Sequence, residues 1–163
     1  MNRLSRLFLL TGFPVIALSF SSCSSTSDSG SIATITKVNP YHLQPGQRII
    51  TDDRMIAFEQ VHHYHGAITA EDFVNKFGHY FSIFWKTKDK GSDVTVKLEY
   101  TQANTGATIH VKEVAVANPK SRNTTKIEVI GEEYAKNGPV TSWNASIISG
   151  GQAIAEFPSF LWK

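Results

Sequence analysis

The stretch 93–102, Asp-Val-Thr-Val-Lys-Leu-Glu-Tyr-Thr-Gln, decides the fold class of this chain. Its apolar side chains occupy every second position, and polar side chains fill the positions between them. Successive side chains of a β-strand point to opposite faces, so this alternation predicts a strand with one buried and one exposed face. Its β-branched and aromatic residues favour the same conformation. We therefore expect a half-buried strand over 93–102.

Six further segments have strand-like patterns, and turn sequences separate them. These segments are 55–61, 80–87, 109–116, 124–130, 139–147 and 153–157. Short alternating runs with turn residues between them are typical of the strands of an all-β domain. With the stretch 93–102, they predict about seven strands.

Three details refine this expectation. The sequence Ser149-Gly150-Gly151-Gln152 predicts a tight hairpin, because glycine adopts the positive φ angles that two-residue hairpin turns need. The alternation changes phase within 109–116, which predicts a β-bulge near Lys112 and Glu113. The segment 80–87 is rich in aromatic side chains. We expect it in the centre of a sheet, with both of its faces covered.

One segment has the spacing of a helix instead of a strand. Thr69 and Asp72 are placed as in a capping box, an apolar i, i+1, i+4 face follows, and Gly78 is positioned to end the helix. We therefore expect a short helix over 70–77 that lies across the end of a sheet and covers it.

The pattern as a whole predicts an all-β fold with one short helix between the early strands. It resembles an immunoglobulin-like or fibronectin type III-like antiparallel β-sandwich, over about 33–163. The disulfide of antibody domains cannot form, because the chain has a single cysteine. The segment 32–163 is long enough for one such domain and too short for two.

The N-terminus has the composition of a secretion signal. Two arginines precede an apolar stretch over 7–20, which is short and interrupted for a segment that spans a bilayer. The sequence Phe20-Ser21-Ser22-Cys23 resembles the lipobox of bacterial lipoproteins, although Phe20 stands where that family usually has Leu. The resemblance implies a lipid on the Cys23 thiol and cleavage before this residue. An ordinary cleaved signal peptide and an uncleaved membrane anchor are the alternatives.

The resemblance divides the chain into three parts. These are a signal peptide (1–22), a lipidated cysteine with a flexible serine-rich tether (23–31) and the sandwich domain (32–163). Several acyl chains on one residue give stable membrane anchoring. In the lipoprotein family, an uncharged residue such as Ser24 after the cysteine implies sorting to the outer membrane. We therefore expect a membrane-anchored protein of the bacterial cell envelope that faces the periplasm or the cell surface.

The charge balance limits the classes of partner. Lys and Arg total 16 and Asp and Glu total 14, so the predicted mature chain, without Arg3 and Arg6, carries no net charge. A nucleic-acid-binding domain usually has a basic patch, so we do not expect nucleic acid as a partner. A lipidated Cys23 also leaves no thiol for a redox pair or a cysteine nucleophile.

The residues typical of hydrolases are also lacking. The serines gather in the tether, and none lies in a Gly-x-Ser-x-Gly sequence. Pairs of carboxylates occur at 52–53, 71–72 and 132–133, but neighbours in sequence point in different directions, so we interpret them as turn and cap residues. We therefore do not expect an enzyme. A hydrolase acting on envelope polymers, with carboxylates brought together from separate strands, is the alternative.

Histidines form the strongest candidate for a metal site. His63 and His65 would share one face of an extended segment, and His79 could approach from the adjoining strand. Three neutral imidazoles with an open position suit Zn(II) or Cu(II). Solvated or helix-packing histidines are the alternative interpretation.

Aromatic side chains are numerous, and we expect most of them in the core. Exposed ones would suit stacking on sugar rings or docking of a protein partner. The run 157–163, Phe-Pro-Ser-Phe-Leu-Trp-Lys, is expected to dock on the sheet as a last strand, with binding to another molecule as the alternative. We therefore expect a protein that acts without catalysis, through contacts with an envelope protein or polymer. Binding of Zn or Cu by the histidines is the alternative function.

Overall fold

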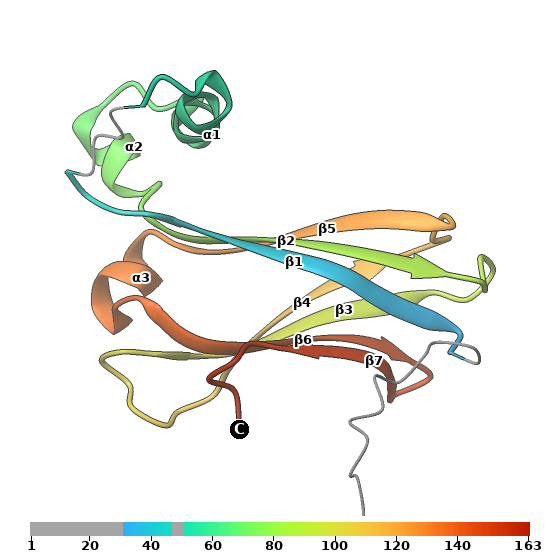
Figure 1. The fold of residues 1–163 in the computed structure, drawn as a ribbon. Helices are drawn as coiled ribbons and strands as arrows, with labels where there is room; N and C mark the ends of the chain where they lie inside the picture. The colour runs from blue at the N-terminus through green and yellow to red at the C-terminus, as the bar shows by residue number, and fades with distance from the viewer. Residues whose placement is uncertain (1–30, 47–50) are drawn as a thin grey trace, which may run out of the picture.

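The structure, a computed structural model, describes residues 31–46 and 51–163 as a two-layered β-sandwich with short helices (Figure 1). Cys23, the predicted signal peptide and the tether before Ser31 lie outside the described residues. Seven strands in two antiparallel sheets make up the described sandwich. The prediction of an all-β sandwich of about seven strands is confirmed.

The two sheets differ in size. The smaller sheet has the order β1 (Ala33–Leu43), β2 (Gly78–Thr87), β5 (Arg122–Ile130). The larger sheet has the order β4 (His110–Val116), β3 (Val94–Gln102), β6 (Val140–Ser149), β7 (Gln152–Pro158). The helices are α1 (Arg54–Tyr64), α2 (Ala70–Val74) and α3 (Glu132–Asn137). The predicted central position of 80–87 is confirmed, because β2 lies between β1 and β5. The prediction that both faces are covered is wrong for the outer face, where Phe84 is half-buried and Lys86 is exposed.

The strand order resembles that of immunoglobulin-like domains except at one strand. The first, second and fifth strands share one sheet, and the third, sixth and seventh share the other. Constant-type immunoglobulin domains place the fourth strand beside the fifth, whereas β4 pairs here with β3. Within the described residues, β5 therefore has a strand partner on one side only.

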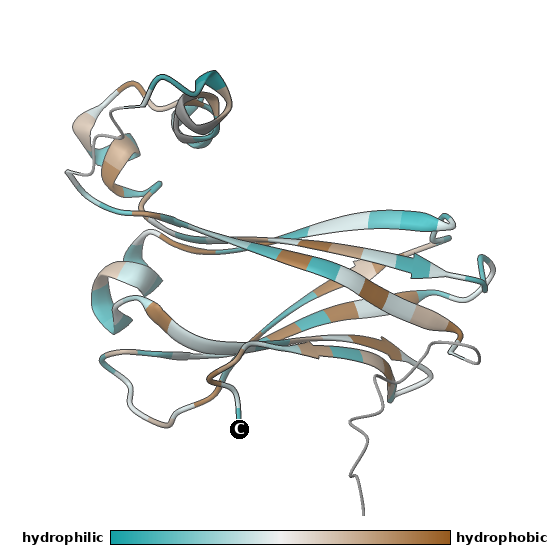
Figure 2. Cartoon of the chain, viewed as in Figure 1, coloured by the Kyte–Doolittle hydropathy of each residue, from teal (hydrophilic) through white to brown (hydrophobic). Residues whose placement is uncertain are grey.

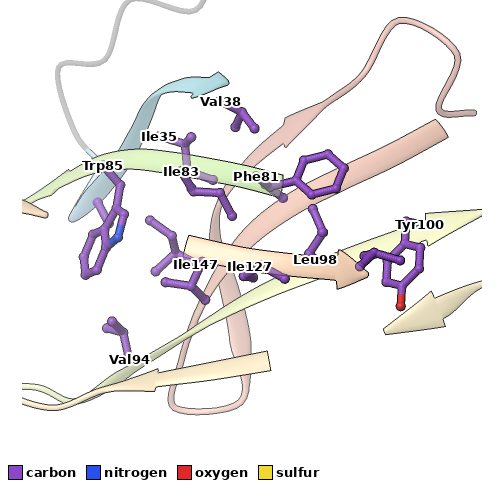
Figure 3. Packing of buried hydrophobic residues seen from close by; sticks show 14 residues of the cluster. Ile35, Val38, Phe81, Ile83, Trp85, Val94, Leu98, Tyr100, Ile127 and Ile147 are labelled. Carbon is purple, nitrogen blue, oxygen red and sulfur yellow. The ribbon is translucent and has the colours of Figure 1, made fainter. Parts of the chain in front are cut away.

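The core lies between the two sheets. Every second residue of β3 is buried, as the alternation over 93–102 predicts. Side chains of both sheets point toward one another in the core, among them Trp85 of β2, Leu98 of β3 and Ile147 of β6 (Figure 3). Burial of one such side chain contributes about 1.5–3 kcal/mol to stability. The Trp85 indole N–H donates to the Thr125 hydroxyl at 3.1 Å, so its polar atom is paired.

The strand expected at 55–61 is wrong, because this segment lies within helix α1. Asp53 caps the helix by accepting a hydrogen bond from the backbone N–H of Met55 at 2.8 Å. Met55 and Phe58 stand one helical turn apart. A short apolar run does not distinguish a strand from a helix by its periodicity alone, which explains the error.

Strand β1, in contrast, was not predicted. Its register on β2 shifts between Ile35 and Lys37, so its apolar residues do not alternate throughout. Pro40 also lies within it, and proline in a strand is confined largely to edge strands, which is where β1 lies. The predicted number of strands is therefore right, although one predicted strand is a helix and one observed strand was missed.

The bulge predicted near Lys112 and Glu113 is also wrong. Strands β3 and β4 pair without any shift of register. Val111 is exposed to solvent, and Lys112 points inward beside its cross-strand neighbour Leu98. The change of phase in the sequence therefore reflects an apolar outer face and an inward-pointing charge, not an inserted residue.

The predicted hairpin is confirmed, because Gly150 and Gly151 have φ of 57° and 80° in the turn that joins Ser149 to Gln152. Helix α2 is confirmed together with its capping box, but it ends at Val74. Gly78 begins β2 instead of ending the helix, and a Cβ there would lie 2.2 Å from the carbonyl oxygen of Val129.

Helix α2 does not cover the sheet as expected. None of its residues is buried, and the Phe73 ring lies 5.3 Å from the ring of Tyr64 in α1. Figure 2 shows apolar residues in this part of the chain as well as along the strands of both sheets. Helix α3, which was not predicted, follows β5 directly.

Candidate functional site

Helices α1 and α2 form an arm at one end of the sandwich, which we call the helical arm (54–77). Figure 1 shows it beyond the smaller sheet, where β1 ends and β2 begins. Strand β1 starts next to Ser31 and has 11 residues. At about 3.3 Å per residue it separates the helical arm from Ser31 by roughly 35 Å.

An aromatic clamp, made by Tyr41, His63 and Tyr80, holds α1 on the sheet. Tyr41 and Tyr80 are cross-strand partners of β1 and β2. The His63 ring stacks on Tyr41 at 4.7 Å and lies 3.9 Å from the ring of Tyr80. The Tyr80 hydroxyl donates to the carbonyl oxygen of Lys76 at 2.6 Å, which ties the end of the arm to the same strand.

The electrostatics of the clamp favour a neutral histidine. Burial, followed by the repulsion from His62, lowers the pKa of His63. Burial, followed by the negative charge of Glu128, raises the pKa of Tyr80 to about 12. Both rings of this pair are therefore uncharged at neutral pH, as apolar stacking requires.

The N-terminal half of α1 is not held in this way and overhangs a groove of about 600 Å³, which we call the arm groove. Met55 is 74 % exposed and Phe58 is 61 % exposed, although both line the groove. The opposite wall comes from the outer faces of β2 and β5, through Tyr80, Lys126 and Glu128. The arm groove is thus open and has apolar residues from the helix on one side.

The rim of the arm groove carries charges of both signs. Glu59 and Glu128 contribute carboxylates, and Lys76 and Lys126 contribute ammonium groups. Pockets of a few hundred Å³ with an apolar lining and a small number of polar groups are typical of binding sites. This arrangement suits a ligand with a large apolar group and charged neighbours.

A second polar cluster lies inside the sandwich, on the other face of the smaller sheet. The His42 and His79 rings stack at 3.8 Å. The Gln44 amide donates to Nδ1 of His42 at 2.9 Å, which places the proton of the neutral ring on Nε2, 2.8 Å from the Tyr134 hydroxyl. The N–H of His42 therefore joins β1 to α3.

His79 is the member of this cluster that has a buried polar atom without a hydrogen-bond partner. It is 9 % exposed, and its Nε2 has no hydrogen-bond partner. Burial, followed by the neighbouring His42, lowers the pKa of His79 to about 4. This ring is therefore neutral near pH 7, and protonating it is costly in the folded state.

The structure does not bring the predicted metal ligands together. His63 faces the helical arm with Tyr80, whereas His79 lies on the inner face of β2 with Phe81. His65 is exposed at the C-terminal cap of α1. Among the described residues, no group of three or more His, Cys, Asp or Glu is arranged to hold a metal ion. Zinc or copper binding by these histidines stays a prediction.

One member of each carboxylate pair has a structural partner. Asp53 and Asp72 cap α1 and α2, as expected of cap residues. Glu133 in α3 accepts a hydrogen bond from the Tyr100 hydroxyl and pairs with the Lys112 ammonium at 2.7 Å. Burial raises the pKa of the Glu133 carboxyl, but these two partners outweigh it and hold the pKa below its usual value.

The C-terminal run docks only in part. Phe157 stacks on Trp143 at 6.3 Å, and β7 ends at Pro158. The prediction of a docked last strand is wrong for Phe160 and Leu161, which are 97 % and 64 % exposed. They lie in a turn in which the backbone N–H of Trp162 donates to the carbonyl oxygen of Ser159 at 3.0 Å.

The sequence interpretation missed the arm groove because it assigned a strand to the residues of α1. Asp53 before two apolar residues three positions apart was the local signal for a helix. The position of the groove depends on the contact of His63 with Tyr41 and Tyr80, which are distant in sequence. No local pattern carries that information.

Comparisons with known protein families, with curated proteins and with solved structures gave no match. In the part of the chain that the structure describes, no helix has the length and apolar character needed to cross a membrane.

Proposed function

We propose that this chain is a lipid-anchored protein of the bacterial cell envelope that acts without catalysis, by binding a partner in the arm groove. The observation that carries the proposal is the exposure of Met55 and Phe58 over a groove of binding-site size. Large apolar side chains that gather at an open groove mark interaction sites more often than isolated exposed residues do. The lipobox-like sequence at Cys23 supports the location.

The position of the helical arm suits an anchored binding protein. A lipid on Cys23 would attach the sandwich through the short tether, near Ser31. The arm groove then lies roughly 35 Å further along β1, so it points away from the membrane. Anchoring raises the local concentration of a weakly binding groove without adding any contact.

Metabolic labelling with a palmitate analogue tests the anchor. We expect labelling of the native chain and of the Ser24→Ala variant, and none of the Cys23→Ala variant. Ser24→Ala is the control because it changes the adjacent residue and keeps the thiol. Equal labelling of the native chain and Cys23→Ala would contradict lipid anchoring.

Photo-crosslinking in intact cells tests the groove. A benzoyl-phenylalanine replaces Phe58 in one variant and Val111 in the control; Val111 is 51 % exposed and lies on the outer face of the larger sheet. We expect defined adducts from position 58 and few from position 111. Adducts of equal yield at both positions, or none at position 58, would refute binding in the arm groove.

A further inference from the structure

We propose that the end of the sandwich at which β1 begins binds the phosphate headgroups of an anionic membrane surface. We call it the basic end and define it by two segments, 86–93, which runs from the end of β2 to the start of β3, and 117–122, which leads into β5. This inference goes beyond the arm groove, which lies near the other end of β1. It shares only the membrane with the proposed function.

The two segments of the basic end form one continuous surface. The backbone N–H of Thr87 donates to the carbonyl oxygen of Ser121 at 3.3 Å, and the N–H of Lys88 donates to the carbonyl oxygen of Ile32 at 2.9 Å. These bonds hold the turns beside the start of β1. Figure 1 shows the turns at the end of the sandwich opposite the helical arm.

Two hollows open on the basic end, and each is lined by cations without any carboxylate. The first, of about 320 Å³, is lined by Lys86, Lys88 and Arg122 together with threonine and serine hydroxyls. The second, of about 450 Å³, is lined by Arg122 again and by Lys120 and Lys126. All five side chains are exposed. Ammonium and guanidinium groups make strong, charge-assisted hydrogen bonds to phosphate oxygens, so both hollows suit phosphate groups.

Lys86 and Arg122 are placed where a bound anion would stabilise them. They are cross-strand partners of β2 and β5, so their side chains start from neighbouring positions on the outer face of the smaller sheet. Like charges directly opposite each other on two strands destabilise a sheet. In the part of the chain that the structure describes, neither side chain has an ion-pair partner. A phosphate between them would offset this repulsion.

The carboxylates of the basic end do not cancel its positive charge. Its two segments hold five lysines and arginines against Asp89 and Asp93. Asp89 accepts a hydrogen bond from the backbone N–H of Gly91 at 2.9 Å, and Asp93 accepts one from the N–H of Asn118 at 3.1 Å. Neither carboxylate lines either hollow. The basic end therefore keeps an excess of three positive charges.

The opposite end of the molecule has the reverse imbalance. The segment 51–77, which contains the helical arm, holds five carboxylates against Arg54 and Lys76. Charge is thus separated along the length of β1, although the predicted mature chain has no net charge. An anionic membrane surface attracts basic segments within about a Debye length and repels acidic ones. It would therefore orient the molecule with the basic end toward the lipid and the helical arm away from it.

The position of the predicted anchor agrees with this orientation. Ser31 lines the first hollow, and Cys23 lies eight residues before it. Eight residues span at most about 29 Å. A lipid on Cys23 would therefore keep the basic end close to the membrane, whereas the arm groove lies a further strand length away.

Energy transfer to membrane lipids tests the inference in the full chain, isolated from cells in its mature form. A fluorescent amino acid replaces Ala117 at the basic end in one variant and Val61 in the helical arm in another; both positions are exposed. The vesicles contain an acceptor lipid in phosphatidylcholine alone or in equal parts of phosphatidylcholine and phosphatidylglycerol. Phosphatidylglycerol should raise the transfer from position 117 about twofold or more and should not raise it from position 61. Salt at about 1 M should remove the rise, because it screens charges beyond about 3 Å.

A charge-matched pair of variants tests whether the hollows carry the effect. In the chain labelled at position 117, Lys88→Gln/Arg122→Gln should lower the ratio of docked to undocked molecules about tenfold or more. Lys136→Gln/Lys163→Gln is the control, because it changes the net charge equally at exposed positions outside the basic end, and it should leave the ratio unchanged. All four side chains are exposed, so the sandwich is expected to fold in both variants.

Three results would each overturn the inference. These are equal transfer from position 117 in the two kinds of vesicle, an equal loss in the two double variants, and an equal rise at positions 117 and 61. The labels involve neither Cys23 nor Phe58, so the two proposals fail in distinguishable ways. A rise at position 117 without palmitate labelling or groove adducts refutes the proposed function alone, and labelling and adducts without the rise refute this inference alone.

Discussion

The sandwich core and the helical arm place similar apolar side chains in opposite environments. Leu98 and Trp85 are at most 1 % exposed between the sheets, whereas Met55 and Phe58 are more than half exposed over the arm groove. Apolar surface contributes to folding only where folding removes it from water. The comparison therefore teaches that the residues of the arm can change with little effect on folding, and those of the core cannot.

The largest loss of stability is expected from a substitution in the core. A substitution of an exposed apolar residue in the helical arm is its matched control. Leu98→Ala should lower the free energy of unfolding by about 2–5 kcal/mol, because it removes buried methyl groups and leaves a cavity. Phe58→Ala should change it by about 0.5 kcal/mol or less. Urea unfolding measures both values. Similar losses of unfolding free energy for the two variants would contradict the claim that the core and the arm differ in their contribution to folding.

The next largest loss of stability is expected at Gly78, where the helical arm joins β2. Gly78 has φ of 142°, and a Cβ there would clash with the backbone of Val129. Gly78→Ala should therefore cost about 1–3 kcal/mol of stability in thermal or urea unfolding. Gly150→Ala is the control, because it also has positive φ but has no atom within 4 Å of the added Cβ. A smaller loss at Gly78 than at Gly150 would contradict the proposed clash.

The buried histidine should make the stability of the sandwich depend on pH. The pKa of His79 is about 4 in the folded chain, below its ordinary value of 6.5, so the unfolded chain binds a proton more readily. The stability present above pH 6.5 should decrease as the pH falls from 6.5 toward 4. His79→Phe keeps a ring beside His42 and should weaken this dependence, as measured by the melting temperature at each pH. His65→Gln, at the exposed C-terminal end of α1, is the control; an equal effect of both variants would argue against His79 as the origin.

The smallest effect on overall stability is expected at the aromatic clamp. His63→Ala removes the ring that stacks on Tyr41 and Tyr80, and should free α1 while the sandwich stays folded. Amide hydrogen exchange in α1 should accelerate at least tenfold, with little change in β3. His65→Ala is the control, because His65 is exposed at the end of the same helix. Acceleration in both regions would show that arm and sandwich unfold together.

The same division explains how far the sequence predicted the structure. Strands such as 93–102 and the Gly150-Gly151 hairpin were predictable, because each depends on a local pattern. Strand β1 was missed because its register shift and Pro40 obscure the alternation. The arm groove could not be predicted, since it forms where His63 meets Tyr41 and Tyr80 after the chain has folded. The placement of β4 beside β3 likewise depends on pairing between strands, which a single strand pattern does not specify.

Lys112 on edge strand β4 has a consequence for chains crowded together on a surface. Its ammonium points inward and donates to the carbonyl oxygen of Glu128 on β5 at 2.7 Å, so one side chain bridges the two layers at their unpaired borders. An inward-pointing charge on an edge strand disfavours pairing with a strand of another molecule, because that pairing would remove water from around the ammonium group. The inward-pointing charge thus disfavours strand pairing between neighbouring molecules at this edge.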